Sequence, residues 1–289
     1  MEAMIGAVRL KQWIRFGKEL LRRLARDDMP AYAAALAYKF LFALFPLVLF
    51  LTALLGFLHI AGGVTKVVRP LDAVIPPAVL HLLQRSIVEA VHHENPTVLS
   101  LGIVGFLWGM SGAFLGLMDA FNHAYELPYP YHRSLWHRYS VAIGTGVIVG
   151  MLFIAVLVVG TGGSEATRWA LAHLLHWPVD QQVSIAIHWI LLLVLLVLSL
   201  DILYTVLPDV GLRFMILRPG TILATVVFLV MSSLFSLYTS HFNTYNKMYG
   251  SLGTVILLLL YLYFFALAIL LGAELNAMTG HHLHKPHKK

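Results

Sequence analysis

A single lysine stands inside a long apolar stretch of this sequence. Residues 31–58 are almost wholly apolar, yet they contain Lys39 and a proline, Pro46. An apolar helix of ~20 residues is long enough to cross a bilayer. A charge within such a helix is costly unless it finds a partner or reaches water. The chemistry open to this lysine is electrostatic, either pairing with a carboxylate or binding an anionic group.

Acidic and polar side chains stand near the ends of three later apolar stretches. They are Asp119, Asn122, Asp201, Tyr204 and Glu274. If the chain crosses the membrane alternately, all of them fall in the same half of the bilayer as Lys39. One hypothesis is a polar cavity open to the cytoplasmic leaflet, in which Lys39 pairs with Asp119, Asp201 or Glu274 and the carboxylates carry protons. In the alternative, Lys39 reaches back to the membrane surface, and Glu274 with Asn276 caps a helix end.

The composition is that of a membrane protein. The 289 residues are 59% hydrophobic, and mean hydropathy is +0.80. Continuous apolar runs predict helices, whereas a β-barrel would show alternation. The expected fold is therefore all-α, a bundle of six transmembrane helices. The predicted spans are about 31–58, 97–120, 139–160, 183–207, 216–239 and 251–275, and the segment between the third and fourth, with Trp169 and Trp177, is predicted as a loop.

Three regions flank or form this bundle. Residues 1–29 form a basic amphipathic segment, residues 30–277 the transmembrane domain, and residues 278–289 a basic, histidine-rich tail. The N-terminal segment predicts a helix over 4–26 that lies on an anionic membrane surface or packs on the protein's own cytoplasmic side. A second amphipathic helix is expected over 77–93, at the opposite membrane face.

The positive charges predict the orientation. The sequence has 20 Lys and Arg residues, and 14 of them lie in the N-terminal segment, the second and fourth connections, and the tail. An excess of Lys and Arg marks cytoplasmic loops. Both termini are therefore expected in the cytoplasm.

Small residues recur on one face of the second span. Gly105, Gly109, Gly112 and Gly116 share a face at helical spacing, which favours close packing of another helix. The alternative is a smooth wall beside a substrate path. Pro46 removes one backbone hydrogen bond, so it predicts a kink that is either static or a hinge.

The sequence indicates no enzyme. No phosphate-binding glycine loop, nucleophile elbow or metal-ligand spacing is present, and there is no cysteine, so no thiol chemistry is expected. We expect no catalytic residue, no cofactor, no metal and no nucleic-acid partner. The N-terminal Trp13 and Phe16, opposite the basic residues, suit lipid better than RNA.

Several short motifs together resemble a known family. They are Ala33-Ala34-Ala35-Leu36-Ala37-Tyr38, Leu44-Phe45-Pro46-Leu47, Asn122-His123-Ala124-Tyr125, Leu207-Pro208, Arg218-Pro219-Gly220, Phe235-Ser236-Leu237-Tyr238, Tyr249-Gly250-Ser251-Leu252-Gly253 and Leu271-Gly272-Ala273-Glu274-Leu275-Asn276-Ala277. In this order they resemble the YihY/BrkB family of bacterial inner-membrane proteins, once labelled ribonuclease BN. The resemblance implies six membrane helices and, from some members, a link to export of envelope lipids. The family usually has a neutral residue where Lys39 stands.

Two functions are therefore expected. The first is a transporter or flippase of an anionic lipid or other amphiphile, whose head group meets Lys39. The second is a non-transporting membrane scaffold that gathers periplasmic envelope-assembly partners. The glycine face of the second span also allows a homo-oligomer.

Overall fold

The computed structural model describes residues 15–57, 96–128, 133–174, 177, 179–210, 215–241 and 243–280. The predictions for residues 4–14, for the amphipathic helix over 77–93 and for the histidine-rich tail beyond residue 280 lie outside the described residues.

The described chain is helical and contains no strand. Its long helices are α2 (Met29–Phe57), α5 (Pro96–Ala124), α6 (Leu135–Leu174), α7 (Gln181–Val206), α8 (Pro219–His241) and α9 (Asn243–Gly280). Residues 15–26 form a further helical segment before α2. The continuous apolar runs explain this fold class, because lipid offers no partners to backbone groups outside helices or closed barrels.

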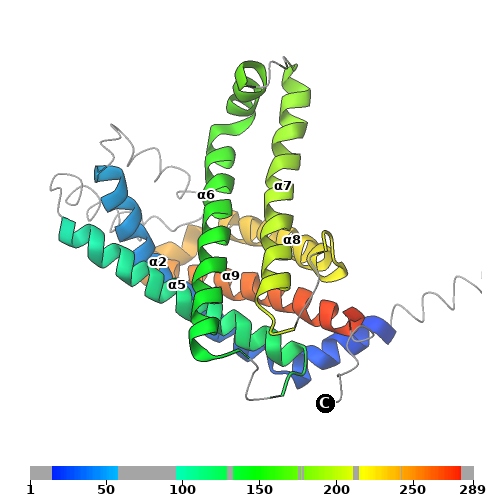
Figure 1. Ribbon diagram of the computed structural model, residues 1–289. Helices are drawn as coiled ribbons and strands as arrows, with labels where there is room; N and C mark the ends of the chain where they lie inside the picture. The colour runs from blue at the N-terminus through cyan, green and yellow to red at the C-terminus, as the bar shows by residue number, and fades with distance from the viewer. Residues whose placement is uncertain are drawn as a thin grey trace, which may run out of the picture.

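The helices pair with their neighbours in sequence or across the bundle. Helix α2 packs along α5, α8 along α9, and α6 along α7, while α2 also contacts α9. Helices α6 and α7 rise side by side as a hairpin away from the other four (Figure 1). The hairpin joins the rest mainly through its lower end, where α6 meets α5 and α7 meets α8.

Much of the helical surface is apolar and exposed. Trp136 of α6 and Trp108 of α5 have 86% and 79% of their surfaces exposed, and many aliphatic side chains of α6 and α7 are exposed as well. Four helical stretches are long and apolar enough to cross a bilayer: Ser100–Ala124, Leu135–Val156, Gln181–Val206 and Val255–Gly280. Shorter apolar stretches lie in α2 and α8. A surface this apolar needs lipid around it, so the chain is a membrane protein.

The loop prediction after the third span was wrong at Trp169. Helix α6 continues beyond residue 160 to Leu174, so Trp169 lies in helix where a loop was predicted. Gly163 has φ of 65° and ψ of −171° within this element, and glycine takes that conformation at little cost. The chain therefore bends at Gly163 and then resumes a helix. Helix α9 begins at Asn243, before the predicted sixth span at about 251–275, and its stretch that is long and apolar enough to cross a bilayer is Val255–Gly280.

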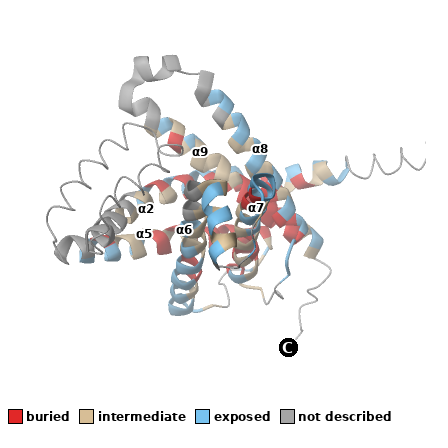
Figure 2. Cartoon of the chain, turned by 90° about the horizontal axis from the view of Figure 1, so that it is seen from above, coloured by how far each residue is buried: buried red, intermediate tan, exposed pale blue. Residues whose placement is uncertain are grey.

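The buried residues gather at one end of the bundle. The core joins side chains of α2, α5, α7, α8 and α9, among them Met29, Phe121, Leu207 and Leu270. In Figure 2 they concentrate where these helices meet, while the far parts of the helices are exposed or not described. Leu20 and Leu24 of the 15–26 segment are buried as well. That part of the segment therefore packs on the protein, one of the two arrangements expected from sequence.

Candidate functional site

Polar and charged side chains surround this core. The starts of α2, α6 and α8 and the ends of α5, α7 and α9 are joined by hydrogen bonds or ion pairs. We call this region the polar end. Asn122, Asp201, Tyr204 and Glu274, four of the candidates expected from sequence, are all buried there.

Two carboxyl groups meet at the polar end, where the 15–26 segment reaches α9. The Glu274 side chain is fully buried, and its carboxyl group lies within hydrogen-bonding reach of that of Asp27. Neither Glu274 oxygen receives a bond from an N–H or hydroxyl group of the described residues. Because ionised carboxylates only accept hydrogen bonds, a hydrogen bond between the two groups requires a proton.

Arg26 binds the Asp27 carboxylate of this pair. Arg26 donates two hydrogen bonds to Asp27, at 2.8 and 3.0 Å, and also pairs with Glu126 at the end of α5. Burial raises the pKa of Asp27, but the hydrogen bonds and charge of Arg26, with the charge of His123, outweigh it and leave that pKa lowered. Asp27 therefore stays ionised beside Arg26.

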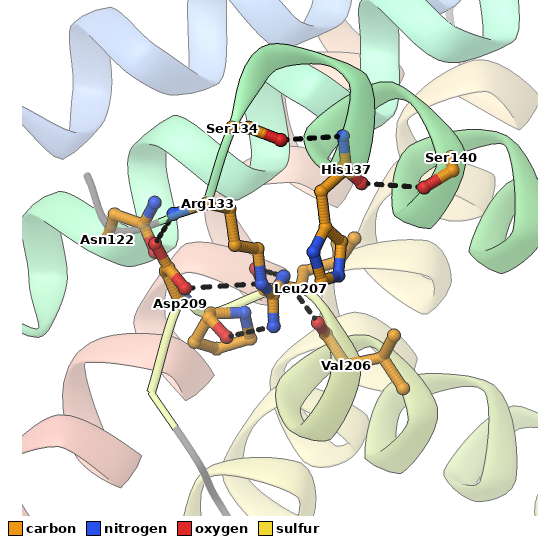
Figure 3. Close-up of polar contacts among 9 residues, drawn as sticks. Asn122, Arg133, Ser134, His137, Ser140, Val206, Leu207 and Asp209 are labelled. Carbon is orange, nitrogen blue, oxygen red and sulfur yellow. Dashed lines mark hydrogen bonds and ion pairs between the residues drawn. The ribbon is translucent and has the colours of Figure 1, made fainter. Parts of the chain in front are cut away.

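Arg133 closes the end of α7 (Figure 3). Its guanidinium donates to the carbonyl oxygens of Val206, Leu207 and Pro208 at 3.1–3.2 Å and lies 3.2 Å from a carboxylate oxygen of Asp209. The Asp209 backbone N–H in turn donates to Asn122 Oδ1 of α5 at 2.7 Å. The last carbonyl groups of a helix have no hydrogen-bond donors within the helix, and Arg133 provides donors to those of α7. Through Arg133 and Asp209, the ends of α5 and α7 and the start of α6 are joined.

Asp201 holds the turn that leads into α8. It accepts hydrogen bonds from the Thr221 hydroxyl and, at 3.0 Å, from the Leu217 backbone N–H. Leu217 has φ of 61°, a left-handed conformation that is unfavourable for a residue with a side chain. Asp201 thus stabilises a strained turn, which is a structural use of a buried charge.

Removing the Asp201 carboxylate is expected to destabilise the protein. Asp201→Ala leaves the buried Thr221 hydroxyl and the Leu217 N–H without their acceptor, at a cost of roughly 2–3 kcal/mol. Thermal unfolding of the purified protein in detergent measures this loss. Glu165→Ala is the control, because the Glu165–Arg168 pair is exposed and such pairs contribute at most ~1 kcal/mol. Equal unfolding temperatures for the two variants would contradict this role.

Helices α7, α8 and α9 meet at two glycines. The Tyr204 hydroxyl donates to the carbonyl oxygen of Ile269 at 2.8 Å, and the Gly220 N–H donates to Asn276 Oδ1 at 2.8 Å. A Cβ atom at Gly272 would lie 2.2 Å from the Tyr204 hydroxyl oxygen. The absence of a side chain at Gly272 therefore lets Tyr204 and the start of α8 approach α9.

A buried arginine and a tyrosine complete this region. Arg218, which precedes α8, is buried and donates to the carbonyl oxygen of Tyr204 at 3.4 Å. Burial raises the pKa of Tyr125 to about 12, although the nearby charge and hydrogen bond of Arg218 lower it in part. Tyr125 is therefore a neutral hydrogen-bonding group at physiological pH.

Lys39 lies against the glycine face of α5. A Cβ atom at Gly116 would be 2.7 Å from Lys39 Nζ, so the lysine occupies the space that a side chain there would fill. Lys39 is only half-buried. No carboxylate among the described residues lies within ion-pair distance of its ammonium group.

The rest of the glycine face also receives α2. A Cβ atom at Gly109 would lie 3.1 Å from Ala43 Cα, and one at Gly105 would lie 3.2 Å from Pro46 Cβ. At Gly112 the same test finds nothing within 4 Å. Close approach of the two helices therefore uses three of the four glycines.

The structure does not form the ion pair considered for Lys39. Asp119, on the turn after Gly116, pairs instead with Arg138 of α6. Asp201 and Glu274 are bonded as described above. Each of the three carboxylates that could have neutralised Lys39 is thus engaged elsewhere, because helices outside the Lys39 region supply better-placed partners.

Sequence reasoning missed Asp27, Arg133 and Asp209 as members of this region. Each lies in a short connection that it treated only as a source of positive charge. A usable signal was present, since Asp27, Glu126 and Asp209 are acidic residues within connections of net basic character. Acidic groups at such places are candidates for specific pairing with the arginines beside them.

Comparison with known proteins places this chain among membrane proteins. It is 29% identical over 273 residues to the putative ribonuclease-like protein YfkH of Bacillus subtilis, covering 94% of this chain and 96% of that protein. It is 28% identical to a UPF0761 membrane protein of Azotobacter vinelandii and 25% identical to one of Pseudomonas aeruginosa, covering 90% and 91% of this chain. The chain spans 62% of the length of each of these two relatives.

No solved structure matches the chain significantly. The family model described as Virulence factor BrkB matches residues 20–289. This range covers the six long helices described above and each motif that carried the resemblance. The chain therefore belongs to the virulence factor BrkB family of membrane proteins.

Proposed function

We propose that this protein moves an anionic lipid or other amphiphile between the leaflets of the membrane. One observation carries the proposal. The Lys39 ammonium group lies in an apolar stretch of α2, half-buried against Gly116, without a carboxylate partner among the described residues. A positive charge at such a place is costly, and an anionic head group would neutralise it.

The surroundings of Lys39 suit an amphiphile. Tyr38 and Phe42 beside it on α2 are exposed, so they face the surrounding lipid. A head group could contact Lys39 while its acyl chains stay in the bilayer. In this proposal Asp119 and Asp201 hold the fold, since both are bonded within the protein, and the carboxyl pair of Asp27 and Glu274 is left for proton coupling.

We further infer that all six long helices cross the bacterial inner membrane, with the polar end and both termini in the cytoplasm. The two terminal segments and the second and fourth connections carry 14 of the 20 Lys and Arg residues, as cytoplasmic segments do. The protein has no enzymatic role, cofactor or nucleic-acid partner in this proposal. A homo-oligomer is compatible with it.

Reconstitution tests the proposed activity. Purified protein in liposomes should move a labelled anionic phospholipid faster than protein-free liposomes do, and it should move a zwitterionic analogue with the same acyl chains less. The charge of Lys39 is the physical reason for this preference. The assay is repeated with a pH gradient imposed in each direction across the liposome membrane. Equal rates for protein-containing and protein-free liposomes under all of these conditions would contradict the proposal.

A second function is a non-transporting membrane scaffold for envelope-assembly partners. The observation in its favour is that Asn122, Asp119 and Asp201 are all bonded within the protein, which leaves fewer polar groups for a substrate. The same liposome assay separates the two functions, because a scaffold moves no lipid.

A further inference from the structure

We propose that Asp27 and Glu274 form a proton-binding site that controls docking of the 15–26 segment on the end of α9. The inference does not depend on which substrate, if any, the protein moves. Its ligand is a proton held between two carboxyl groups, one at the junction of the segment with α2 and one on α9.

The contact itself carries the argument. Glu274 is fully buried, neither of its carboxyl oxygens receives a bond from an N–H or hydroxyl group of the described residues, and the Asp27 carboxyl group lies beside it. Two carboxyl groups can share a hydrogen bond only when one of them is protonated. Without the proton, two buried negative charges would face each other, and desolvation and repulsion would both oppose their contact.

The charges around the pair keep the proton at one place. Arg26 binds Asp27 with two hydrogen bonds, and Arg23 and His123 add positive charge nearby. Glu126 of α5 adds a negative charge and shares Arg26 with Asp27. Because Asp27 is satisfied by Arg26, Glu274 is the partner without another donor, and its proton is the one that the contact requires.

Loss of this proton should separate the elements that the pair joins. Asp27 follows a helical segment that is fixed to the bundle by Leu20, Leu24 and the Arg26–Glu126 pair. When the proton leaves to solvent, the pair gains one negative charge, and the repulsion acts directly between this segment and α9. The docked state binds one proton more than the undocked state, so docking weakens as pH rises.

The absence of cysteine makes the movement measurable in the full chain. Spin labels on Leu21→Cys and Trp136→Cys, two exposed positions of the 15–26 segment and α6, report their separation by electron paramagnetic resonance. From mildly acidic to alkaline pH, the ratio of docked to undocked protein should fall by up to about tenfold per pH unit, the limit for release of one proton.

Two substitutions identify the group responsible. Glu274→Gln supplies a permanent N–H donor to Asp27, so the docked distance should persist at every pH. Asp27→Asn should likewise remove the pH dependence, which keeps the test valid if one variant fails to fold. Glu165→Gln, an exposed control on α6, should respond to pH as the parent does. A parent distance that is independent of pH, or a Glu274→Gln variant that responds like the parent, would overturn the proposal.

Discussion

Gly220→Ala should prevent stable folding. A Cβ atom at Gly220 would lie 1.9 Å from the carbonyl oxygen of Gly272 and 2.6 Å from Asn276 Nδ2. The first of these atoms belongs to the backbone, so relief requires α8 and α9 to separate. Overpacking usually costs 1–3 kcal/mol and occasionally more, and we expect a loss above about 3 kcal/mol because this contact cannot relax by a side-chain rotation.

The measurement is the yield and thermal unfolding of the detergent-purified variant. Gly144→Ala is a matched control, because a Cβ atom there meets nothing within 4 Å. Alanine exceeds glycine in helix propensity by about 1 kcal/mol, so this control should unfold at or above the temperature of the parent. If Gly220→Ala folded as well as Gly144→Ala, the close approach of α8 and α9 would be wrong.

Arg133→Ala should give the second large loss of stability. The substitution removes the donors to three carbonyl groups at the end of α7 and the ion pair with Asp209. Arg133 and Asp209 are mostly buried, with 19% and 10% of their side-chain surfaces exposed. Breaking a buried pair by removing one partner costs about 3–5 kcal/mol, and we expect a loss in that range.

A second arginine gives the control for this prediction. Arg168→Ala removes a pair with Glu165 whose side chains are both largely exposed, so the unfolding temperature should change little. Arg133→Lys should be intermediate, because an ammonium group keeps the charge but lacks the planar fork that reaches several acceptors. Equal unfolding temperatures for Arg133→Ala and Arg168→Ala would contradict the closure of α7 by Arg133.

Helix formation and the glycine spacing could be predicted from the sequence. The length and hydropathy of an apolar run locate a membrane helix, because the bilayer sets the number of consecutive apolar residues and requires their backbone groups to bond within the helix. The sequence also pointed to part of the polar end. The motif from Leu271 to Ala277 carried part of the resemblance to the family, and Glu274 within it was a candidate site residue. The bend at Gly163 was missed because a glycine among apolar residues is also compatible with a continuous helix.

The partners of the charged residues could not be predicted in this way. Arg133 bonds to Asp209, and Arg26 bonds to Glu126, although many residues separate them in sequence. Such pairings depend on which helix ends the tertiary fold brings together. Lys39 is an example. The sequence offered three carboxylates at its depth in the membrane as ion-pair partners, but in the fold each of them contacts another group.

The most direct test of the proposed transport is the effect of Lys39 on lipid movement in liposomes. With a labelled anionic phospholipid, Lys39→Leu should reduce the protein-dependent rate by about tenfold, equivalent to ~1.4 kcal/mol of lost interaction. Lys39→Arg should retain most of the rate, and Lys18→Leu, which alters an exposed lysine of the 15–26 segment, should leave it unchanged. A Lys39→Leu variant that folds and moves the anionic lipid at the parent rate would contradict the account.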